Sequence, residues 1–98
     1  MTVPLEMTWL RPAGKPQPFG VSIHHAVSGQ AIADGEVSET EQRLVTMLPG
    51  PGRYAINIER RRGVFPSYRF AENRQKTLIV EVAQDQPAVS LRFALLPW

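Results

Sequence analysis

The stretch LPGPGRYAINIE, residues 48–59, decides the fold of this chain, because it places a rigid hinge directly before an alternating segment. Pro49 and Pro51 fix their own φ angles and have no N–H to donate, so they end any preceding strand. The glycine after each proline allows the positive φ that a sharp reversal requires. From Tyr54 to Ile58 every second residue is apolar, which predicts a strand with its apolar face in a core.

The same period of two recurs along all 98 residues, whereas helical spacing is not sustained anywhere. Turn-forming residues separate about seven such segments, the pattern of an all-β, Ig-like sandwich in one domain spanning 1–98. The weakest segment, 30–37, is expected to break at Asp34-Gly35, a favoured hairpin pair. The residues predicted to face inward are Leu5, Met7, Trp9, Val21, Ile23, Tyr54, Ile56, Ile58, Leu78, Val80, Val82, Val89, Leu91, Phe93 and Leu95.

Composition sets limits on partners and on cellular compartment. The formal net charge is only +2, so the chain as a whole is no polycation, although its second half is the basic one. There is no cysteine, which excludes disulfides and thiolate metal sites. The first ten residues lack the basic and apolar regions of a signal peptide, and no apolar stretch approaches the ~20 residues of a membrane span. A cytoplasmic location is the default expectation, with export independent of a signal peptide as the alternative.

The order of these features resembles the prealbumin-like (transthyretin-like) β-sandwich of carboxypeptidase regulatory-like domains. That family has a Gly-x-Pro turn before its second strand, matched here by Gly14-Lys15-Pro16. It also launches a central strand from a Leu-Pro-Pro-Gly-x-Tyr element, matched by residues 48–54 with one residue inserted. The resemblance covers nearly the whole chain. It implies the fold and leaves the function open, because one fold hosts many functions.

The residues that carry known chemistry of such folds are missing. Prealbumin-like hydroxyisourate hydrolases use histidines and a Tyr-Arg-Gly-Ser terminus, whereas this chain ends FALLPW and has no histidine after His25. His24 and His25 are adjacent in a predicted strand, so they point to opposite faces and cannot readily share a metal ion. The acidic residues between 34 and 41 lack the ligand spacing of a calcium loop. We therefore expect a non-enzymatic protein with no cofactor and no metal.

One segment, about 60–76, fits no strand well and is expected to be a long loop, a length at which loops are usually functional or mobile. It combines basic residues with aromatic rings, and the apolar C-terminal Trp98 adds a second feature of this kind. The candidate partner-binding residues are Arg60, Arg61, Arg62, Phe65, Tyr68, Arg69, Phe70, Arg74 and Trp98.

The expected function is an interaction or structural accessory module that binds another protein, such as an adaptor within a larger phage-like or secretion-type assembly. Arginine and tyrosine are enriched in protein interfaces, and an exposed sheet edge would add a surface for strand addition. The alternative is a carbohydrate-binding module, which would need exposed rings. A further alternative is nucleic-acid binding through the arginines and aromatic rings of segment 60–76, a combination that such surfaces use. The low net charge makes that alternative weaker, because nucleic-acid-binding domains are usually strongly basic.

Overall fold

A computed structural model describes residues 2–9, 19–37, 43–59 and 68–95. These residues form eight strands. The strands are β1 (Val3–Trp9), β2 (Phe19–His25), β3 (Ala31–Val37), β4 (Arg43–Leu48), β5 (Gly52–Glu59), β6 (Tyr68–Phe70), β7 (Thr77–Val82) and β8 (Val89–Leu95).

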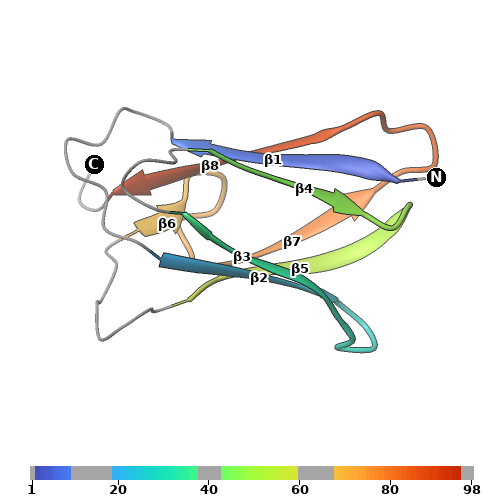
Figure 1. Ribbon diagram of the computed structural model, residues 1–98, viewed down its shortest axis with the longest axis horizontal. Coiled ribbons are helices and arrows are strands. Elements are labelled where there is room, and N and C mark those ends of the chain that lie inside the picture. The colour runs from blue at the N-terminus through green and yellow to red at the C-terminus, as the bar shows by residue number, and fades with distance from the viewer. Residues whose placement is uncertain (1, 10–18, 38–42, 60–67, 96–98) are drawn as a thin grey trace.

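The strands lie in two layers that face each other (Figure 1). One sheet has the order β4-β1-β8-β6 and the other the order β3-β2-β5-β7. All pairings are antiparallel except that of β1 with β8, which is parallel. The described part of the chain thus confirms the predicted all-β sandwich. The one strand beyond the predicted seven is β6.

The hinge at 48–52 works as its residues predict. Strand β4 ends at Leu48 and β5 begins at Gly52, whose φ of 150° lies where residues with a side chain are strained. The Tyr54 ring is buried, and its hydroxyl donates a hydrogen bond to the Gly50 carbonyl inside the turn. This bond satisfies a polar group that burial would otherwise leave unpaired, and it ties the start of β5 to the hinge.

The core lies between the sheets and follows the predicted faces closely. Its buried members are Val3, Leu5, Met7, Val21, Ile23, Leu48, Tyr54, Ile56, Ile58, Phe70, Val82, Val89, Leu91 and Phe93. Leu78 and Val80 were predicted to be inward and do face the core, but they stay partly exposed because β7 is an edge strand. The side chains of Trp9 and Leu95 are outside the described set.

The predicted break at Asp34-Gly35 is wrong. Strand β3 runs through both residues, with Asp34 opposite Ser22 and Gly35 opposite Val21. The glycine serves packing between the sheets, because a Cβ at Gly35 would lie 3.1 Å from Leu44 Cδ1 on β4. The chain reverses earlier, where the Gly29 N–H donates to the carbonyl of the last β2 residue at 2.9 Å.

Candidate docking surface

The structure places only part of the predicted partner-binding set. Arg69, Phe70 and Arg74 are described, as is the backbone of Tyr68 within β6. Outside the described residues lie Arg60, Arg61, Arg62, Phe65 and Trp98. The described part of the predicted loop consists of β6 and the turn that follows it. We call residues 69–76, the end of β6 and this turn, the basic turn.

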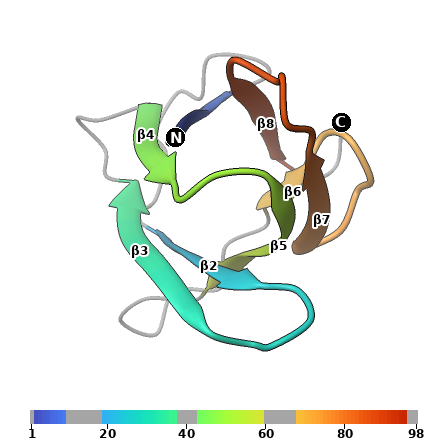
Figure 2. The ribbon, with the colours of Figure 1, turned by 90° about the vertical axis from the view of Figure 1, so that its right-hand side faces the viewer.

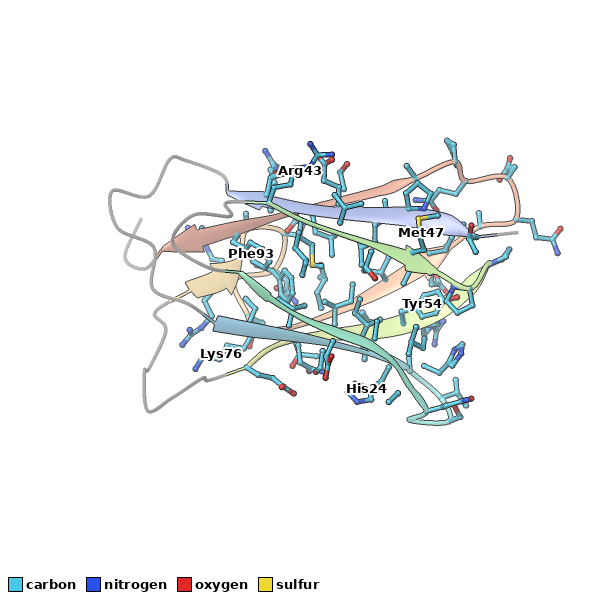
Figure 3. All side chains as sticks on the ribbon, viewed as in Figure 1. His24, Arg43, Met47, Tyr54, Lys76 and Phe93 are labelled. Carbon is cyan, nitrogen blue, oxygen red and sulfur yellow. The ribbon has the colours of Figure 1, made fainter. Side chains whose placement is uncertain are left out.

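Phe70 belongs to the core and not to a binding surface. It is fully buried and lies opposite Phe93 in the β6–β8 register, with ring centroids 5.7 Å apart. Both rings therefore occupy the inner face of the same sheet, and Figure 3 shows Phe93 between the two layers. The prediction that Phe70 contacts a partner is corrected, as is the prediction of one continuous loop over 60–76. A strand of three residues is too short to show a period of two in the sequence.

Backbone hydrogen bonds hold the basic turn on the sandwich. The Ala71 N–H donates to the Arg92 carbonyl on β8 at 2.8 Å. Within the turn, the Phe70 N–H donates to the Gln75 carbonyl at 2.9 Å, and the Arg74 N–H donates to the Phe70 carbonyl at 2.8 Å. The turn is thus closed on itself and anchored to its neighbour by Phe70 and Ala71.

Asn73 reinforces this turn with its side chain. Its Oδ1 accepts from the Gln75 N–H at 3.0 Å, and its Nδ2 donates to the Thr77 carbonyl at 2.7 Å. The next residue, Arg74, has a φ of 60°, the left-handed conformation that residues with a side chain rarely adopt. Such outliers persist only where surrounding contacts hold them in place, and they occur often at functional sites.

Positive charge prevails on and beside the basic turn. Arg74, Lys76 and Arg92 are exposed, and Arg69 is half-buried. Glu72 offsets part of this charge, because its carboxylate accepts from the Arg92 N–H at 3.1 Å and lies 3.9 Å from the Arg92 Nε. The basic turn and Arg92 together carry four cationic side chains and one carboxylate. Lys76 projects from the end of the sandwich where β6 lies (Figure 3).

The two histidines lie on β2 and do not form a metal site with the described carboxylates. His25 stacks on Tyr54 with ring centroids 5.3 Å apart, whereas His24 points away from the sandwich (Figure 3), as expected for neighbours in a strand. No three His, Cys, Asp or Glu side chains of the described segments are grouped to hold a metal ion. The hollow between β3 and β4 measures about 90 Å³. Two wider surface depressions measure about 300 Å³, beside Ser22 and His24, and about 450 Å³, beside Val27 and Glu81.

Comparison with known proteins places the chain in no family. No protein-family model matches the sequence, and no curated protein is significantly similar to it. Among the described residues, no helix is long and apolar enough to span a membrane.

Proposed function

We propose that the protein is a non-enzymatic docking module that binds an acidic surface of another protein through the basic turn. The observation that carries this proposal is the rigid presentation of charge by Arg69, Arg74 and Lys76 on a turn anchored to the core by Phe70. A surface held in its binding conformation loses little entropy on association, so more of the contact energy is retained as affinity.

The preceding arginines extend the proposed surface. Arg60, Arg61 and Arg62 belong to the same chain segment, and Phe65, Tyr68 and Trp98 would supply the apolar contacts that interfaces need beside charge. Strand β5 holds its regular alternation up to Glu59, where the Ser22 hydroxyl donates to the Glu59 carboxylate at 2.8 Å. The binding segment in this proposal begins after that residue.

Two alternatives have less support from the described residues. A carbohydrate-binding module would need exposed rings, but Tyr54, Phe70 and Phe93 are each no more than 1% exposed. Nucleic-acid binding would use aromatic rings for stacking on bases, and Phe70 is not available for that contact. A docking role fits the charge on the turn without needing exposed rings among these residues.

The family and the larger assembly are part of the same proposal. We infer that the chain is a member of the prealbumin-like family and an adaptor in a phage-like or secretion-type assembly. The hinge at 48–54 supports the family. The hydrogen bond from the Tyr54 hydroxyl to the Gly50 carbonyl explains why the tyrosine occurs together with the Pro/Gly turn.

Affinity capture from the native host tests this function. Arg74→Glu is compared with Arg43→Glu, which changes the net charge equally but lies on β4, where Arg43 pairs with Glu6 at 2.8 Å. We expect the wild type and Arg43→Glu to capture the same protein, and Arg74→Glu to bind it about tenfold more weakly, a loss of about 1.4 kcal/mol. Equal capture by all three chains would show that the basic turn does not bind the partner.

A further inference from the structure

The backbone N–H of Arg92, beside the basic turn, is held by a side-chain carboxylate. Strand β6 ends at Phe70, and the Ala71 N–H then donates to the Arg92 carbonyl. The N–H and the carbonyl of one strand residue point to the same side, so the Arg92 N–H also faces the basic turn. No backbone carbonyl of the described segments accepts from it. Instead it donates to Glu72, whose two carboxylate oxygens lie 3.1 Å and 3.4 Å from the Arg92 nitrogen.

The guanidinium of the same arginine is not hydrogen-bonded to Glu72. Its Nε lies 3.9 Å from the Glu72 Oε1, which is close enough for the two charges to attract but beyond hydrogen-bond reach. The Arg92 side chain is 57% exposed, so its N–H donors are accessible from solvent. A planar guanidinium binds a carboxylate best through two parallel N–H bonds. Arg92 therefore keeps donors available for a carboxylate from outside the chain.

The other two ion pairs among the described residues are closed. The Arg43 Nη2 lies 2.8 Å from the Glu6 carboxylate, and the Arg53 Nη2 lies 2.7 Å from the Glu81 carboxylate. Both distances allow a direct hydrogen bond between the side chains. Of the three described pairs, only the one beside the basic turn leaves its guanidinium at a longer distance. The available arginine thus lies next to the proposed docking surface.

We propose that Arg92 binds a side-chain carboxylate of the partner, and that Glu72 occupies this site as an internal substitute until the partner displaces it. This inference rests on the proposed function, because it names the group that the acidic partner presents beside the basic turn. The incoming carboxylate replaces Glu72 at the guanidinium and at the backbone N–H. The Arg92 N–H keeps an acceptor in both states, so the exchange leaves no buried donor unpaired.

Competition by Glu72 has a measurable consequence. An internal competitor lowers the apparent affinity of a ligand by the fraction of molecules in which the site is open. Glu72→Gln removes the charge but keeps a side-chain oxygen that can accept from the Arg92 N–H, so the turn stays anchored. If Glu72 served only to hold the turn, the substitution would bring no specific gain in affinity.

An NMR titration of the full chain with a hexaglutamate peptide tests the site. The peptide is acetylated and amidated, so that only side-chain carboxylates act as ligands. The matched control is Glu81→Gln, which changes the net charge equally. Glu81 lies about 13 Å along β7 from Thr77, beyond the Debye length of about 8 Å at physiological salt. We expect Glu72→Gln to bind the peptide about fivefold more tightly than the wild type, and Glu81→Gln to stay within about twofold of it.

Arg92→Lys tests the arginine without altering Glu72. It keeps the charge and the backbone N–H but removes the planar pair of donors, so it should bind the peptide several-fold more weakly at an unchanged melting temperature. Its control is Arg53→Lys, which should bind like the wild type. In the wild type, the amide resonance of Arg92 should shift during the titration, whereas that of Arg53 should not.

Three results would overturn this inference. They are equal affinities of Glu72→Gln and Glu81→Gln, equal affinities of Arg92→Lys and Arg53→Lys, or no binding of the peptide at concentrations up to about 1 mM. The capture experiment with Arg74→Glu is read separately. If that variant loses the partner while the peptide results fail, the basic turn is still the docking surface and only the role of Arg92 and Glu72 is wrong.

Discussion

The ring of Phe70 lies 5.7 Å from the ring of Phe93, inclined by 33°, across the register that pairs β6 with β8. This contact joins the basic turn to the core. The basic turn presents Arg74 and Lys76 as exposed cations, while Phe70 at its start is fully buried and holds the turn on the sandwich.

Phe70→Ala should destabilise the fold by about 3–5 kcal/mol, because it removes a buried ring and leaves a cavity beside Phe93. Chemical denaturation followed by tryptophan fluorescence measures the change. Phe70→Leu is the control, and we expect it to lose much less because it refills most of the volume. Equal stability of Phe70→Ala and the wild type would contradict the burial of this ring.

Tyr54→Phe should destabilise the fold by about 1–3 kcal/mol. The substitution keeps the ring in the core but leaves the Gly50 carbonyl without its buried donor. Thermal melting of the two proteins, compared with that of Ile56→Val, separates the effect of the hydroxyl from that of core volume. If Tyr54→Phe melts at the wild-type temperature, the bond to Gly50 contributes nothing to stability.

Arg74→Gly should stabilise the fold by roughly 0.5–1 kcal/mol. A left-handed residue with a side chain costs about 1–2 kcal/mol, and the greater chain entropy of glycine in the unfolded state offsets part of the gain. Gln75→Gly is the matched control, since no strain is relieved there, and it should destabilise. The denaturation midpoints of both variants are compared with that of the wild type. A loss of stability in both would mean that contacts of the Arg74 side chain stabilise the fold by more than its left-handed backbone costs.

Gly35→Val should destabilise the fold by about 1–3 kcal/mol, because its side chain would press on Leu44 across the gap between β3 and β4. The same substitution should cost less in a Leu44→Ala background, where that space is vacant. A double-mutant cycle of unfolding free energies measures this coupling. Strictly additive effects would argue that the two side chains do not meet.

Local chemistry was sufficient to predict the long strands. In β5, the large apolar side chains of Tyr54, Ile56 and Ile58 alternate with Ala55 and Asn57, and a strand buried on one face requires this pattern whatever its partners. The same signal failed at two places where the deciding contact is distant in sequence. Asp34-Gly35 has the chemistry of a hairpin, but its glycine is needed opposite Leu44 of the other sheet. Tyr68–Phe70 is recognisable as a strand only beside β8, more than twenty residues further along the chain.

The sequence alone determined the fold class, the hinge before Tyr54 and the inward face of most strands, because each depends on residues within a few positions of one another. Only the tertiary structure decided that Phe70 is core, that β7 lies at a sheet edge and that the basic turn is held against Arg92. Burial and edge position depend on which strands become neighbours. That order arises from packing two sheets together, and no short stretch of the chain encodes it.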